Sequence, residues 1–493
     1  MIKRVFAVLW ATATALCAQT IGYHEVKTDS SGAIAAWTSY DNVIRQVWKF
    51  WKSGMAPCPN GVPYYLQHQV WKPEHDARGL GGDQIPMALS SWNLLYGYLA
   101  DKDLHRNMTL MAGYWLTHGM TKDTDLWPHL PYPYNTDIHS GIYDGDMRAG
   151  KGYLQPDKAA SFGAELIVLY KITGEQRYLS AAKRIADTLA ARVKAGDAEH
   201  SPWPYRVNAV TGEVHQDQTK EGKPVSASYT TNYTGALRLF SELTALKQGN
   251  YTRAFNLVSA WLKRYPMKNN KWGPFFEDVR TRDYSDTEIN ADTLAMYIVE
   301  HPGWAPLGEA KKILDWSFNT FQNHEYDQWK VVPINEQTVY KVPGNSHTSR
   351  HSSVELSYCE KTSDCATKAD AIRRLNWATY TVAEDGKNRY IRDDIWLTDG
   401  YGDYVRHYLR SMAAASELAP DDQNHLLRTS SVIQEIKYSD DRITYKKFDA
   451  QSREVFKLGA WVPKKVEHGT MVWDAQNKTV RIRSSAREVT IVR

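Results

Sequence analysis

The feature that most constrains this chain is a long succession of helical hairpins. Between residues 38 and 415, apolar residues recur at spacings of three and four, the pattern of helices with one buried face. Gly174 and the pair Gly249-Asn250 separate neighbouring segments by short turns, so these neighbours run antiparallel. The pattern predicts helices over residues 38–52, 86–100, 104–119, 157–172, 176–195, 230–247, 251–265, 288–300, 307–321, 351–359, 366–384 and 399–415.

These segments pair into about six hairpins, which are joined by long loops rich in aromatic residues. The sequence shows no repeat of fixed period, which argues against the common helical repeat families. We therefore expect a mainly α fold, an (α/α)6–7 toroid, over residues 22–418. Because the long loops recur at the same phase of the helical alternation, we expect them to gather at one mouth of the toroid and to form one cleft.

The pattern changes after Pro420. Short segments that alternate apolar and polar residues lie between turns, at residues 431–438, 442–448, 453–458, 466–473 and 479–483. Such alternation is typical of antiparallel strands. We expect these strands to form a small C-terminal β-sandwich-like domain, residues 425–493, that packs on the toroid.

The first eighteen residues have the composition of an export signal. A basic start precedes an apolar run from Val5 to Cys17, and Ala18-Gln19 is a suitable cleavage point. The run is too short to cross a bilayer, and no later stretch could do so. We therefore expect residues 1–18 to be a signal peptide and the mature chain to be secreted or periplasmic. In an oxidising compartment Cys359 and Cys365 could close a small disulfide loop.

The aromatic composition indicates a ligand with both apolar faces and hydroxyl groups. The chain has 18 Trp and 30 Tyr but 11 Phe, and Trp and Tyr combine a flat face with a polar atom. Sugar rings have the matching chemistry, so we expect a polysaccharide substrate. The net charge of +4 comes without a basic run, which argues against nucleic acid. The aromatic residues that we expect to bind substrate are Trp127, Tyr143, Trp203, Tyr233 and Trp272.

The densest group of polar side chains lies between Pro343 and His351. Pro343 and Gly344 interrupt the preceding structure, and a helical pattern starts near His351, so we expect the group at a loop-to-helix junction. His347, Arg350 and His351 bring two imidazoles and a guanidinium together. Such a junction is a place where a fold can present chemistry.

Three residues elsewhere complement this group. Asn290 lies at the start of a helical segment, Arg392 lies before the last helix, and Tyr401 lies in a Gly-flanked segment that enters it. Amide, imidazole, guanidinium and phenol are the groups that β-elimination on a uronic acid needs. A base removes the C5 proton, donors hold the carboxylate on which charge builds, and an acid protonates the leaving oxygen. That scheme requires no metal and no cofactor.

The helical toroid, the export signal and the order of Asn290, His347 and Tyr401 resemble the alginate and glucuronan lyases, especially polysaccharide lyase family 38. The resemblance implies that Asn290 and Arg392 neutralise the substrate carboxylate. It implies that His347 is the base or its helper and that Tyr401 is the acid. The resulting hypothesis is a secreted, monomeric polysaccharide lyase.

Three further residues are expected to contact the same substrate, namely Arg350, His351 and Tyr404. The first two belong to the polar group, and the third follows Tyr401 into the last helix. A mildly basic chain also helps an anionic polymer to approach.

Other functions remain open. An inverting glycoside hydrolase on an α/α toroid needs an acid and a base with room for a water between them, and Asp144 and Glu277 are the best such pair. His347 and His351 share a helical face, but no Glu stands at the general-base position of a zinc protease motif, so no metal is expected. A glycan-binding protein without activity would show the same aromatic loops, but it has little need for converging Asn, His, Arg and Tyr.

Overall fold

The computed structural model describes residues 19–54, 84–137, 142–218, 222–275, 286–388, 391 and 399–493. The long helices in these ranges alternate between an inner and an outer ring. The inner ring consists of α2 (Gln84–Leu99), α4 (Pro156–Thr173), α6 (Thr234–Ala245), α9 (Glu288–Glu300), α11 (Asn345–Thr362) and α13 (Asp399–Ala414). The outer ring consists of α1 (Tyr40–Lys49), α3 (Lys102–His118), α5 (Gln176–Arg192), α7 (Thr252–Arg264), α10 (Leu307–Phe321) and α12 (Lys368–Thr379).

The inner ring is closed. Its helices contact one another in chain order, and α13 packs against both α11 and α2. Each of α3, α5, α7, α10 and α12 packs on the inner helix that precedes it, and α1 packs on α13. The predicted α/α toroid is therefore confirmed, with six helical pairs in the described part of the chain.

One predicted helix boundary is wrong in a way that matters for the site. The helix predicted from residue 351 is α11, which begins at Asn345. Gly344 is its extended N-cap residue, with φ −102° and ψ 149°. Ser, Thr and His usually compete with helix formation through their side chains, but here the polar group is buried and paired within the fold. His347, Arg350 and His351 therefore lie in the first two turns of a helix and not in a loop.

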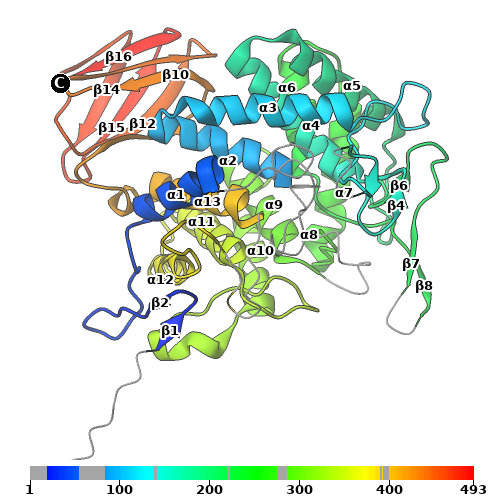
Figure 1. Cartoon of the computed structure of the whole chain (residues 1–493), viewed down its shortest axis with the longest axis horizontal. Helices are drawn as coiled ribbons and strands as arrows, with labels where there is room; N and C mark the ends of the chain where they lie inside the picture. Colours follow the sequence, from blue (N-terminus) through cyan, green and yellow to red (C-terminus); the bar gives the residue numbers. More distant parts are fainter. Residues whose placement is uncertain are drawn as a thin grey trace, which may run out of the picture.

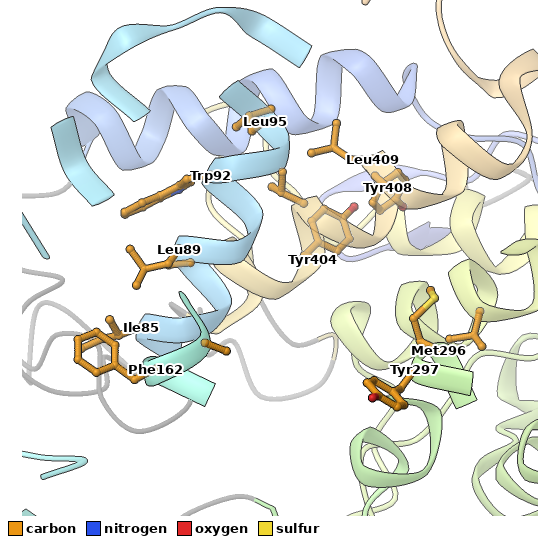
Figure 2. Close-up of a cluster of buried hydrophobic side chains, with 14 of the residues drawn as sticks. Ile85, Leu89, Trp92, Leu95, Phe162, Met296, Tyr297, Tyr404, Tyr408 and Leu409 are labelled. Atoms are coloured by element: carbon orange, nitrogen blue, oxygen red, sulfur yellow. The ribbon is translucent and has the colours of Figure 1, made fainter. Parts of the chain in front are cut away.

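Buried apolar side chains hold the inner ring together. On α2, Ile85, Leu89, Trp92 and Leu95 are all at most 2% exposed, and their spacing places them along one side of the helix. Figure 2 shows these side chains along α2, together with buried side chains of three other inner helices, α4, α9 and α13: Phe162, Met296, Tyr297, Tyr404, Tyr408 and Leu409. Full burial of such a side chain contributes about 1.5–3 kcal/mol.

Two four-stranded antiparallel sheets form the C-terminal domain, which confirms the predicted antiparallel β region. One has the order β10 (Ile433–Tyr438), β11 (Arg442–Lys447), β16 (Glu488–Val492) and β13 (Lys465–Glu467). The other has the order β14 (Gly469–Asp474), β15 (Thr479–Ser484), β12 (Ser452–Leu458) and β9 (Asn424–Thr429). Tyr445 and Phe456 pack between the sheets with ring centroids 5.4 Å apart.

The strand predicted over residues 466–473 is in fact two strands. His468 has a φ of 64° and lies between β13 and β14, which belong to different sheets. A residue in this left-handed region cannot continue a strand. Strands β9 and β16 were not predicted from the sequence pattern.

The other described elements outside the C-terminal domain are short. They are the strands β1 (Thr20–Ile21), β2 (His24–Glu25), β3 (Gly145–Asp146), β4 (Gly150–Lys151), β5 (Tyr153–Leu154), β6 (Val207–Asn208), β7 (Gln216–Gln218) and β8 (Pro224–Ser226), and the short helices η1 (Phe50–Gly54), α8 (Pro266–Asn269), η3 (His324–Trp329) and η4 (Ser416–Leu418). The hairpin of β7 and β8 projects from the helices (Figure 1).

Two expectations about export bear on the structure. Cys359 near the end of α11 is bonded to Cys365 in the turn before α12, which is the pairing that the sequence left open. The predicted signal peptide, residues 1–18, lies outside the described residues. Within the described ranges, every helix is too short or too polar to cross a membrane.

Candidate active site

The inner helices all begin at the same end of the toroid, because each is antiparallel to its outer partner. The long connections between outer and inner helices lead into this end, which we call the mouth. The polar group of α11 lies at the mouth, since it occupies the first turns of an inner helix. Facing it are the first turns of α9 and α13.

A ladder of two carboxylates and two imidazoles joins α9 to α11. Glu288 and Asp292 are four residues apart on α9, and His347 and His351 are four residues apart on α11. The Nδ1 atom of His347 lies 2.8 Å from Glu288 Oε2, and Nδ1 of His351 lies 2.8 Å from Asp292 Oδ2. All four side chains are at most 1% exposed. The imidazole orientations are thus fixed by the neighbouring helix.

Arg350 links this ladder to α13. One of its terminal nitrogens donates to Glu288 at 2.7 Å, and the other forms an ion pair with Asp403. Asp403 also lies 2.9 Å from Nε2 of His407 and 2.5 Å from Arg406. Two carboxylate–imidazole pairs, Glu288 with His347 and Asp403 with His407, therefore share one guanidinium.

The imidazole of His347 is in its neutral form at neutral pH. Burial lowers its pKa, and the opposing effect of the Glu288 carboxylate does not restore the ordinary value. Burial likewise raises the pKa of Glu288, although Arg350 and His347 oppose the change. When Glu288 is ionised, the form that its ion pair with Arg350 favours, Nδ1 of His347 donates to the carboxylate and Nε2 carries the lone pair of a base.

The two other imidazoles differ in protonation. Burial and the charges of Arg350 and Arg406 hold the pKa of His407 well below its usual value, so it is neutral. Burial also disfavours the charged form of His351, but Asp292 and Glu355 outweigh this effect and raise its pKa to about 10. His351 is therefore a buried imidazolium that pairs with Asp292 and Glu355 inside the fold, whereas His347 and His407 are uncharged.

A cavity of about 90 Å³ lies on the toroid axis beside this network. All six inner helices contribute to its wall, and Arg350 and His407 are the members of the network that face it together with Arg406. The other charged groups of the wall are Glu165, Arg238, Glu300 and Arg410. Four guanidinium groups and two carboxylates thus surround this space, and the excess of positive charge in its wall suits an anionic group.

Asn290 lies at the mouth but its amide is already engaged. Its Nδ2 atom is 3.0, 3.1 and 3.2 Å from the carbonyl oxygens of Trp272, Gly273 and Pro274. Lys158, which is buried beside Asp157, donates to the carbonyl of Phe275 at 2.9 Å. Asn290 and Lys158 together therefore hold the backbone of residues 272–275 at the edge of the site.

The aromatic residues predicted to bind substrate are buried. Trp127, Tyr143, Trp203, Tyr233 and Trp272 are at most 6% exposed. Trp203 donates to the carbonyl of Leu189, and Tyr233 donates to the carbonyl of Trp203. Tyr404 is also buried, and its hydroxyl donates to the carbonyl of Ala378. The described structure thus places these residues in the core and does not bring them together around the axial cavity.

The remaining predicted residues are placed only in part. Arg392 and Glu277 lie outside the described residues, and Tyr401 is part of α13 with its side chain outside the description. Asp144 is described: its Oδ1 accepts from the backbone and hydroxyl of Thr136, both at 2.9 Å, and Lys151 lies 3.2 Å from its Oδ2. Asp144 therefore stabilises a turn in the connection that leads to α4.

Three residues of this network, Glu288, Asp403 and His407, were not predicted from the sequence. A signal for them was present, because Glu288 and Asp292 repeat at a spacing of four, as do His347 and His351. Asp403 and His407 have the same spacing on the last helix. Acidic residues and histidines with matching i,i+4 spacing on different inner helices can pair across the ring. Within the described residues, no group of three or more His, Cys, Asp or Glu side chains could hold a metal ion.

Comparison with known proteins defines the fold class. Neither a protein-family model nor a curated protein sequence matches the chain. Among solved structures, cellobiose 2-epimerase from Bacillus thermoamylovorans B4167 is similar, with a TM-score of 0.53, 14% identity, and coverage of 75% of this chain and 97% of the epimerase.

Two enzymes with other activities are equally similar. A D-mannose isomerase has a TM-score of 0.53 and 8% identity, and the match covers 76% of this chain and 97% of the isomerase. A family 76 glycoside hydrolase from a bovine Bacteroides thetaiotaomicron strain has a TM-score of 0.52 and 13% identity, and the match covers 77% of this chain and 78% of the hydrolase. At such identities the likeness concerns the fold alone, which is the α/α toroid.

Proposed function

We propose that the chain is a carbohydrate-active enzyme that cleaves a uronic-acid-containing polysaccharide by β-elimination. The observation that carries the proposal is the position of His347, whose Nδ1 lies 2.8 Å from Glu288 beside the guanidinium of Arg350 and whose pKa is lowered by burial. A neutral imidazole can accept a proton, and an adjacent cation can stabilise the negative charge that builds on the carboxylate as the proton leaves. The predicted export signal fits a substrate outside the cell.

The reaction assigns each group one task. His347 takes the proton from C5, the electrons of that bond form the double bond between C4 and C5, and the C4–O bond breaks. The leaving oxygen receives a proton from Tyr401, and solvent returns the proton from His347 to Tyr401 afterwards. No oxidant or metal is consumed in this sequence.

Arg350 is the described residue best suited to hold the substrate carboxylate. It lines the axial cavity, which Asn290 does not. Both residues already have partners: Arg350 pairs with Glu288 and Asp403, and Asn290 binds the carbonyls of residues 272–274. Arg392 is the second proposed carboxylate donor. We retain Asn290 as a residue whose amide shapes the edge of the same site.

A second candidate is epimerisation of a sugar, which the second carboxylate–imidazole pair favours. Inverting a carbon next to a carbonyl requires removal of a proton on one side and its return on the other, and His347 and His407 could share these steps. The similar epimerase and isomerase structures have the same fold. Inverting hydrolysis by Asp144 and Glu277 is the third candidate, and binding of glycans without reaction is the fourth.

One set of assays separates these functions. Purified protein is incubated with alginate, glucuronan, pectate, neutral glucans and reducing disaccharides, and absorbance near about 235 nm is recorded beside a reducing-sugar assay, because only elimination creates the conjugated unsaturated uronate. Rising absorbance supports the lyase. New reducing ends without absorbance indicate a hydrolase, and a changed disaccharide stereochemistry in NMR spectra without cleavage indicates an epimerase.

A further inference from the structure

A second, larger cavity lies at the end of the toroid opposite the mouth. Its volume is about 570 Å³, within the usual range of small-molecule sites. The wall is formed by the last turns of α2, α6, α9, α11 and α13 and by β9 with the start of β10. We call it the basal cleft. Arg428 of β9 and Glu360 of α11 form a two-pronged ion pair, at 2.8 and 2.6 Å, in its wall.

The charges of the basal cleft are balanced. Three carboxylates and three cationic groups line it, and they are Glu242, Glu300, Glu360, Lys361, Arg410 and Arg428. A site without net charge gains little from binding an anion or a cation. Its wall also carries the hydroxyls of Ser357, Thr429 and Ser431 above a floor of aliphatic side chains that includes Leu409 and Leu426.

One ion pair in the cleft is incompletely satisfied. Arg410 and Glu300 approach to 3.6 Å, which is too far for a hydrogen bond, and within the described residues the Arg410 side chain donates none. Both residues also line the axial cavity. A guanidinium and a carboxylate at this separation can each bind one of two adjacent hydroxyl groups, since the carboxylate accepts and the guanidinium donates.

We propose that the basal cleft is a second binding site, specific for an uncharged saccharide of one or two units. The aliphatic side chains of the floor contact the apolar face of the sugar ring, and the Glu300 and Arg410 pair binds two neighbouring hydroxyl groups. The inference does not rest on the reaction proposed above, because the basal cleft and the mouth lie at opposite ends of the toroid.

Methionine methyl groups provide the test. Met296 lines the basal cleft and the axial cavity, Met87 lines the axial cavity alone, and Met471 lies in β14 of the C-terminal domain. Protein labelled with ¹³C at the methionine methyl groups is titrated with cellobiose, a neutral disaccharide. The resonances are assigned by Met→Leu variants, and Met471 serves as the unaffected reference.

The expected result is a saturable shift of the Met296 resonance without a shift of Met87. Asn93→Trp, which fills the cleft from α2, should abolish the Met296 shift, and Glu300→Gln should move it to higher sugar concentrations. An unshifted Met296 resonance would overturn the proposal. So would shifts of Met87 and Met296 that persist in Asn93→Trp, because the sugar would then have entered through the mouth.

Discussion

Replacing Asp292 by Asn should change how stability depends on pH. His351 is fully buried with its Nδ1 atom 2.8 Å from Asp292. Burial disfavours the charged ring, but Asp292 and Glu355 raise its pKa from 6.5 to about 10. In the unfolded chain the ring returns to its ordinary pKa, so above that value the folded state holds a proton that the unfolded state has lost. The resulting stabilisation is complete below pH 6.5 and disappears as the pH rises to about 10.

The size of this pH dependence follows from the one proton that His351 holds in the folded state and loses on unfolding. The free energy of unfolding should fall by about 1.4 kcal/mol per pH unit, or about 3 kcal/mol from about pH 7.5 to about pH 9.5. Asp292→Asn keeps the shape of the side chain but removes its charge, so the pKa of His351 falls and most of this slope is lost. Asp315→Asn, at an exposed position of α10, is the matched control and should keep the wild-type slope.

The assay is urea unfolding at a series of pH values, followed by tryptophan fluorescence and analysed by linear extrapolation. The quantity compared is the change of unfolding free energy with pH in the three proteins. Equal slopes in the wild type and Asp292→Asn would refute the assignment of a buried imidazolium to His351.

Three further changes test the site and the fold. Gly344→Ala should lower kcat by about 100-fold with unchanged circular dichroism, because the added methyl would lie 2.3 Å from the His347 ring and displace it. Glu288→Gln should lower kcat by about 100-fold or more, since His347 loses the charge that orients it; unchanged kcat in either variant contradicts these roles. Reducing the bond between Cys359 and Cys365 should cost about 2 kcal/mol, seen as a lower urea midpoint, and an unchanged midpoint would show that the closed loop adds no stability.

The helical architecture was predictable because it depends on a local pattern. Apolar spacing identified the hairpins, and Gly174 marked a turn that the structure confirms with a left-handed C-cap at φ 76°. The start of α11 was missed because its first turns carry Asn, Ser, His and Thr, which resemble a loop. These residues are helical because partners on other inner helices bind their side chains, and such partners cannot be read from one segment.

The site was predictable only in part for the same reason. His347 and Arg350 were identified, but their carboxylate partners Glu288 and Asp403 belong to helices that are distant in the sequence. The aromatic residues predicted to bind substrate are a separate case. Trp203 and Tyr233 have polar atoms that suit a sugar, yet in the fold those atoms bind backbone carbonyls in the core. Composition alone does not distinguish aromatic side chains that bind a sugar from aromatic side chains that are buried in the core.

The most direct test of the account compares the rates of three proteins on a uronic-acid polysaccharide, measured as absorbance near about 235 nm. They are the wild type, His347→Ala and His324→Ala, the last at an exposed position of η3. We predict that His347→Ala loses a factor of about 10²–10⁴ in kcat while its circular dichroism is unchanged, and that His324→Ala retains full activity. Full activity in His347→Ala, or no absorbance from the wild type on any uronate polymer, would contradict it.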